Sequence, residues 1–131
     1  MRENETFATA VGCMDGRGQE PVSEYARARW HVSYIDTITD AGIVNHIAHT
    51  HNVEYLANIK TKIIDVSVLK HGSRGVVVWG HQECAGHPVP DEHHIEDIKK
   101  AAKRIHEMEP GVEVVPVFVI RQDSSWEVQE I

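Results

Sequence analysis

Two cysteines and one histidine have the residue types and spacing of a metal-binding group. Cys13 follows an apolar run over residues 6–12, whereas His81 and Cys84 follow a second run over 75–79. Thiolates and imidazole nitrogens are preferred zinc ligands, and three protein ligands leave a fourth position open, as in catalytic zinc sites. Bound zinc lowers the pKa of its water to about 7, which would make hydroxide available at neutral pH.

The same three residues also allow a metal-free interpretation. Cys13 and Cys84 could be buried core residues, because free cysteine is among the most buried residue types. His81 could then be a hydrogen-bonded core histidine, and a His-x-x-Cys spacing is by itself weak support for a metal. Glycines and polar residues flank both turns, however, which favours the metal-binding interpretation.

Asp15 and Arg17 follow closely on Cys13 and could take part in the same chemistry. The carboxylate of Asp15 could occupy the fourth metal position and close the site. Alternatively, it could form a bidentate pair with Arg17 and leave that position to water. In the second case Asp15 could accept a hydrogen bond from the water and orient it. An Asx turn beside a solvated arginine is the alternative without chemistry.

Apolar runs separated by turn residues predict the elements that must position these side chains. Strands are expected at 6–12, 31–38, 75–79 and 112–121. Residues 124–131 could add a short edge strand. Helices are expected at 43–71, with a break near residues 50–52, and at 92–108. Residues 18–29 are interpreted as a loop that ends in a short helix over 23–29, after Pro21.

This alternation of strands and helices is typical of an α/β fold. We expect a mostly parallel central sheet of four strands plus the edge strand, with helices on both faces. The unbroken run Val76–Val78 suits a strand that is covered on both faces. Sites in such sheets form beyond the carboxyl ends of strands, where strand order reverses. If the strands over 6–12 and 75–79 are neighbours, Cys13 and His81 meet there.

Size and charge narrow the possible functions. The length of 131 residues fits a single domain over 1–131. A formal net charge of −7 argues against nucleic acid as a partner, because such binding depends on clustered lysine and arginine. We find no apolar stretch of about 20 residues and no signal-peptide core, so we expect a cytoplasmic protein that does not bind membranes. In that setting, two cysteines favour metal ligands or reactive thiols over a disulfide.

The remaining histidines raise weaker hypotheses. His46, His49 and His87 are candidates for carrying a proton away from the site, since imidazole titrates near neutrality. For each of them, an ordinary surface or loop position is the preferred interpretation. His46 and His49 share a helical face and could hold a second metal, which is the weaker hypothesis. His93 and His94 are expected to be solvated, and the three tryptophans are interpreted as packing residues.

Three turns of the chain, taken together, resemble those of the β-class carbonic anhydrases. In order, they are Cys13-Met-Asp-Gly-Arg17, Asp40-Ala-Gly42 and Gly80-His-Gln-Glu-Cys-Ala-Gly86. The family has Cys-x-Asp-x-Arg, Asn-Ala-Gly and His-x-x-Cys turns in the same order and after the same strands. The first and third turns together are specific. Gly16 stands where serine is usual, as in the short bacterial branch, and Thr39-Asp40 replaces an Arg-Asn pair.

The resemblance implies a zinc enzyme. It assigns one Zn²⁺ per chain to Cys13, His81 and Cys84, with Asp15 and Arg17 as the gating and orienting pair. It implies reversible hydration of carbon dioxide to bicarbonate and a proton, and a homodimer that often pairs into a homotetramer. Relatives that hydrolyse carbonyl sulfide or carbon disulfide have the same fold and ligands.

Two other classes of protein remain open at this point. A non-enzymatic zinc-stabilised scaffold would use Asp15 as a permanent fourth ligand. A redox thiol protein would use Cys13 and Cys84 without any metal.

Overall fold

The computed structural model describes residues 2–131 and contains a five-stranded sheet in the order β2-β1-β3-β4-β5. Strands β1, β2, β3 and β4 are parallel to one another, whereas β5 is antiparallel to β4. The strands are β1 (Phe7–Cys13), β2 (Tyr34–Asp40), β3 (Gly75–His81), β4 (Glu113–Gln122) and β5 (Ser125–Glu130). The predicted mostly parallel sheet with an edge strand is therefore confirmed.

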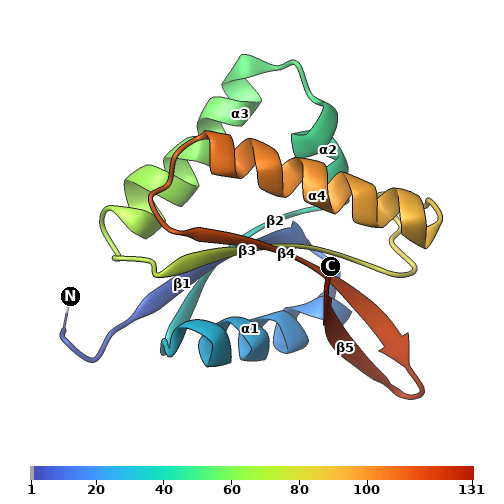
Figure 1. The fold of residues 1–131 in the computed structure, drawn as a ribbon, viewed down its shortest axis with the longest axis horizontal. Coiled ribbons are helices and arrows are strands. Elements are labelled where there is room, and N and C mark those ends of the chain that lie inside the picture. The colour runs from blue at the N-terminus through green and yellow to red at the C-terminus, as the bar shows by residue number, and fades with distance from the viewer. Residues whose placement is uncertain (1) are drawn as a thin grey trace.

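Helices cover both faces of this sheet, as expected. Figure 1 shows α1 on one face and α2, α3 and α4 on the other. The helices are α1 (Gly16–Trp30), α2 (Ile43–His49), α3 (Val53–Lys60) and α4 (Asp91–Glu107), and a π-helical segment, η1 (Thr61–Val68), directly continues α3. Among residues 2–131, no helix has both the length and the apolar character needed to cross a membrane.

The order of the strands reverses between β1 and β3. The chain leaves β1 for β2 on one side, then crosses to β3 on the other side and continues outward to β4. Gly12 of β1 lies opposite Trp79 of β3 in the parallel register. The carboxyl ends of β1 and β3 therefore lie side by side at a topological switch point, which is where α/β sheets form their sites.

Two apolar cores, one on each face, fix the sheet between its helices. Every residue of β3 is buried, which is why its valine run shows no alternation of polar and apolar residues. Val76 and Val78 pack in the core under α2, η1 and α4. Val77 and Trp79 pack in the opposite core against α1.

Helix α1 is longer than the sequence indicated. It begins at Gly16 because the Asp15 side chain accepts a hydrogen bond from the Arg17 backbone N–H at 2.9 Å, which caps the helix. Pro21 lies inside the helix and removes one backbone hydrogen bond. The buried face formed by Gly18, Val22 and Ala26 at four-residue spacing maintains the helix across this position. Residues 23–29 are helical as predicted, but the loop expected before them was wrong.

The start of β2 also differs from the prediction, for a local reason. His31 caps α1 in a left-handed conformation and donates its N–H to the Arg27 carbonyl, so β2 begins at Tyr34, later than predicted. The expected break within 43–71 is confirmed. Asn52 caps α3 by accepting the N–H groups of Glu54 and Tyr55 at 3.0 and 3.1 Å.

The contact of α1 with the sheet predicts that alanine substitution has different effects on stability at two glycines of that helix. A Cβ at Gly18 would lie 2.3 Å from Cζ3 of Trp79, whereas a Cβ at Gly16 meets nothing within 4 Å. We expect Gly18→Ala to lower the free energy of unfolding by about 1–3 kcal/mol through overpacking. Gly16→Ala, the matched control, should leave it unchanged or raise it by up to about 1 kcal/mol. Urea denaturation measures both, and equal effects would contradict this packing.

Candidate metal centre

Cys13, His81 and Cys84 converge at the switch point of the sheet. Cys13 is the last residue of β1, His81 is the last residue of β3, and Cys84 lies in the turn that follows β3. All three are buried, and their candidate ligand atoms lie within 4.8 Å of one another. The two sulfur atoms are 3.8 Å apart and both cysteines are free. The structure therefore brings together the three residues, from two distant turns, that were predicted to be metal ligands.

The arrangement of these atoms fits a zinc ion. Two Zn–S bonds of about 2.3 Å at a tetrahedral angle separate the sulfurs by about 3.8 Å, which matches the distance between Cys13 and Cys84. His81 Nδ1 lies 2.6 Å from the Gln82 carbonyl oxygen and donates to it. The buried Nε2 has no hydrogen-bond partner among residues 2–131 and is thus free to bind a metal.

The two thiols differ in their electrostatic surroundings. Burial acts to raise the pKa of Cys13, but its interaction with the His81 imidazole and with the backbone N–H groups of Gly42 and Asp15 lowers that pKa to about 7. Burial, followed by the neighbouring Cys13, raises the pKa of Cys84. One thiol is therefore close to ionisation at neutral pH before any metal arrives, and thiolate is the form that binds zinc.

The predicted Asp40-Ala41-Gly42 turn supports the metal centre from the neighbouring strand. Gly42 has a φ of +58°, and a Cβ there would lie 2.5 Å from the carbonyl oxygen of Gly86. The backbones of the two turns can approach this closely only because both residues are glycine. Asp40 replaces the usual asparagine, and its carboxylate accepts the Ala41 N–H at 2.8 Å. The turn therefore keeps a side-chain acceptor at this position.

Asp15 and Arg17 form the bidentate pair that was one of the two alternatives. Arg17 Nε donates to Asp15 Oδ1 at 3.1 Å and Nη2 donates to Oδ2 at 2.8 Å. Hydrogen bonds from Arg17 lower the pKa of Asp15 to about 2. Asp15 Oδ2 lies 3.9 Å from His81 Nε2. An ionised carboxylate is thus held at the edge of the three-ligand group without entering it.

A second layer of charged and aromatic residues holds Arg17 in place. This layer was not predicted from the sequence. Glu83 Oε1 accepts from Arg17 Nη1 at 3.1 Å, and Arg121 donates to both Glu83 oxygens at 2.7 and 3.0 Å. The guanidinium carbons of Arg17 and Arg121 lie 4.9 and 4.6 Å from the ring centroid of Trp126. Trp126 is therefore more than the packing residue that was expected. The only sequence signal was the position of Glu83 within the His-x-x-Cys turn.

Comparison with known proteins agrees with this geometry. A family model described as "Putative carbonic anhydrase" matches residues 3–131. The chain belongs to this carbonic anhydrase family. The crystal structure of β-carbonic anhydrase isoform I from the protozoan Trichomonas vaginalis is similar in fold, with a TM-score of 0.55 and 14% identity over 95% of this chain and 82% of that chain. A search of curated proteins gives no match.

In this member of the carbonic anhydrase family, the position of His94 differs from the prediction. His94 was expected to be solvated, but it is buried on the inner face of α4, next to Phe118 and His87. A Cβ on Gly80 would lie 2.5 Å from His94 Nε2, so this nitrogen points at the backbone of β3. The spacing of His94 and Asp97 with the apolar residue Ile98 on one helical face was a signal that could have revealed it.

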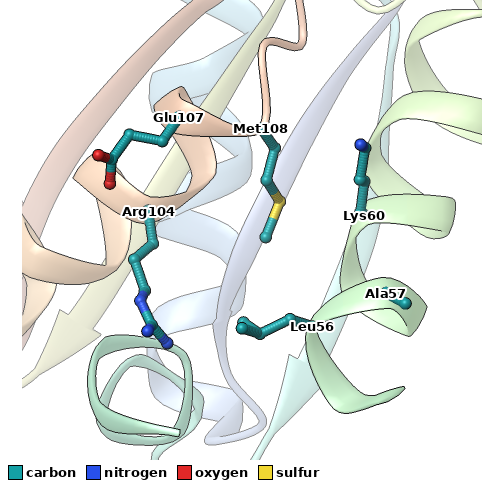
Figure 2. Close-up of a pocket in the computed structure, with 6 residues that line it drawn as sticks. All are labelled: Leu56, Ala57, Lys60, Arg104, Glu107 and Met108. Carbon is teal, nitrogen blue, oxygen red and sulfur yellow. The ribbon is translucent and has the colours of Figure 1, made fainter. Parts of the chain in front are cut away.

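A pocket far from the cysteines has no comparable chemistry. It has a volume of about 280 Å³ and lies between α3 and the C-terminal end of α4. Figure 2 shows Leu56 and Met108 extending into this space. Its one arginine, Arg104, already donates to the carbonyl oxygens of Ile47 and Thr50 at 3.1 and 2.7 Å. We therefore assign the candidate site to the switch point.

The burial of His94 predicts a specific dependence of stability on pH. Burial, then the electrostatic effect of His87 and His81, lowers the pKa of His94 to about 4, against the opposing charges of Asp97 and Asp91. Between pH 6.5 and 4, His94 is therefore protonated in the unfolded chain but not in the folded chain. The free energy of unfolding consequently falls as the pH falls through this window. The shift corresponds to about 3 kcal/mol.

Urea denaturation of the metal-free protein in chelator at pH 7 and pH 4.5 tests this expectation. The loss of stability on acidification should be clearly smaller in His94→Leu than in the wild type. The exposed His106 lies on the same helix, and His106→Leu serves as the control that keeps the wild-type loss. An unchanged loss in His94→Leu would contradict the account.

Proposed function

We propose that this protein catalyses the zinc-dependent, reversible hydration of carbon dioxide to bicarbonate and a proton. Membership of the carbonic anhydrase family supports this class of reaction. The observation that carries the proposal is the buried group of Cys13, His81 and Cys84, whose unpartnered Nε2 lies beside the Asp15–Arg17 pair. When bound to these three residues, zinc supplies Lewis-acid activation of water near neutral pH.

Asp15 is the proposed hydrogen-bond acceptor for the reacting water. Its pKa of about 2 keeps it a carboxylate at any pH at which thiolates hold a metal, so it accepts hydrogen bonds and cannot donate them. Because Arg17 holds both oxygens, the carboxylate is fixed in orientation and stays outside the ligand group. This arrangement supports an open site over the scaffold alternative, in which Asp15 is a permanent ligand.

Arg17 is the proposed positioning residue for Asp15. Its guanidinium contacts Asp15, the side chain and backbone carbonyl of Glu83, and the face of Trp126. Each additional contact limits the rotation of Arg17 and therefore of the carboxylate that it holds. A bidentate pair of this kind requires the planar guanidinium group, which lysine does not provide.

The fate of the released proton remains a prediction. Of the three histidines considered as carriers, His49 and His87 each place Nε2 2.7 Å from an Asp97 oxygen. His46 lies on the exposed side of α2. Carbonyl sulfide and carbon disulfide are alternative substrates for a metal centre with the same ligands. The homodimer or homotetramer and the cytoplasmic location likewise remain predictions.

Replacement of Asp15 gives the sharpest test of this mechanism. Zinc-loaded Asp15→Asn should retain zinc, because Asp15 is outside the ligand group, but should hydrate carbon dioxide about 10- to 100-fold more slowly. This is the range seen when groups that orient a metal ligand are lost. Stopped-flow hydration across neutral and alkaline pH, with zinc quantified in each sample, measures the effect. Carbonyl sulfide and carbon disulfide are assayed in parallel.

Two control variants make the result specific. Asp65→Asn changes an exposed aspartate on η1 and should keep the full rate. Cys13→Ala removes a ligand and should lose both the metal at this centre and the activity. A wild-type protein that holds zinc at this centre without accelerating the hydration would overturn the proposed function. Full activity in Asp15→Asn would remove only the role assigned to Asp15.

A further inference from the structure

A second cluster of titratable side chains lies near the metal centre and shares no residue with its three candidate ligands. Asp97 of α4 is buried, with 1% of its surface exposed, and no lysine or arginine among residues 2–131 pairs with it. Its partners are instead three histidines. His49 ends α2, His87 lies in the turn after β3, and His93 precedes Asp97 by one turn of α4. Three separate segments thus direct imidazoles at one buried carboxylate.

The distances within this cluster are short. His87 Nε2 lies 2.7 Å from Asp97 Oδ2, and His93 Nε2 lies 3.3 Å from the same oxygen. His49 Nε2 lies 2.7 Å from the other oxygen, Oδ1. Candidate ligand atoms of His87, His93 and Asp97 all lie within 4.8 Å of one another. Two imidazole nitrogens and one carboxylate oxygen are a common ligand set for zinc and other divalent transition metals.

One of the ligand separations already matches that of an occupied site. Ligand atoms at about 2.0–2.1 Å from a tetrahedral ion lie about 3.3 Å from each other. The pair His93–Asp97 already has this separation, whereas the pair His87–Asp97 would have to open by about 0.6 Å. His49, on the far oxygen of the carboxylate, is placed to orient Asp97, as groups outside the ligand set do in metalloproteins.

An ion could reach this cluster from solvent. The side chains of His93 and His49 are 54% and 47% exposed, whereas His87 and Asp97 are buried. The cluster is therefore open on one side and closed by the protein on the other. It also differs in chemistry from the first centre, since it contains no thiolate.

We propose that His87, His93 and Asp97 bind a divalent transition-metal ion at a second site, with His49 orienting the carboxylate of Asp97. The ion would join the turn after β3 to helix α4. Because His87 and Cys84 belong to the same turn, the second ion would hold in place the segment that supplies a ligand to the first. The inference does not depend on which reaction the first site performs.

Cobalt distinguishes the two sites, because only a cobalt ion bound by Cys13 and Cys84 gives thiolate-to-metal charge-transfer absorption. Metal-free wild-type protein is dialysed against Co²⁺, and bound cobalt is measured by elemental analysis beside the absorption spectrum. We expect two ions per chain, of which one accounts for the whole charge-transfer band. His93→Ala should keep the band and bind the other ion at least about tenfold more weakly, since even the loss of an outer-shell group has that cost.

The matched control is His106→Ala, which removes an exposed histidine of the same helix and should retain both ions. His93→Gln, a second variant that keeps a polar side chain at this exposed position, should behave as His93→Ala does. One ion per chain in the wild type would overturn the inference, as would two ions of unchanged affinity in both His93 variants. Loss of the charge-transfer band in both His93 variants would also overturn it, because the sites would then not be separate.

Discussion

The parallel pairing of β1 with β3 is the constraint on which the metal centre depends. In this register Gly12 lies opposite Trp79, so Cys13 ends β1 at the edge where His81 ends β3. A slip of one residue would move Cys13 by about 3.3 Å and turn its side chain to the other face of the sheet. A Cβ at Gly12 would lie 2.0 Å from Nε1 of Trp79, so the close approach of the strand to this indole requires glycine.

The centre is held from outside by contacts that depend on distant parts of the chain. The backbones of Gly42 and Gly86 touch, which joins the end of β2 to the turn that carries Cys84. Arg121 lies opposite Trp126 in the β4–β5 hairpin. Trp126 contacts the Arg17 guanidinium, and Arg121 donates to Glu83. The hairpin thus reaches the Asp15 carboxylate through Arg17. Contacts from distant parts of the fold therefore fix the orientation of Asp15, whereas the local sequence shows only that Asp15 lies near Cys13.

The strand ends and the meeting of Cys13, His81 and Cys84 could be predicted from sequence because each rests on a local signal. An unbroken apolar run followed by glycine marks a buried strand, and parallel strands bring their carboxyl ends together. Helix α1 could not be bounded in the same way, because Gly18 and Ala26 give its buried face little hydrophobic signal and Pro21 resembles a start. The burial of His94 and Asp97 was not predicted for a related reason. Both are polar residue types, so the sequence did not mark them as part of the buried face of α4.

The charged layer around Arg17 had no sequence signal of useful strength. Its members come from the turn after β3 and from both strands of a hairpin, and the pairings of β3 with β4 and of β4 with β5 bring them together. The choice between an open and a closed metal site also could not be made from sequence. Asp15 lies two residues from the candidate ligand Cys13 and two residues from Arg17, so it could pair with the metal or with the arginine. The observed pairing with Arg17 depends on the cap of α1 and on Glu83.

Anomalous diffraction at the zinc edge, from crystals of the zinc-loaded protein, would locate the bound ion. We predict a peak about 2.3 Å from the sulfurs of Cys13 and Cys84 and about 2.0–2.1 Å from His81 Nε2, with Asp15 still paired to Arg17. Fully loaded crystals with no anomalous peak between these three residues would contradict this prediction.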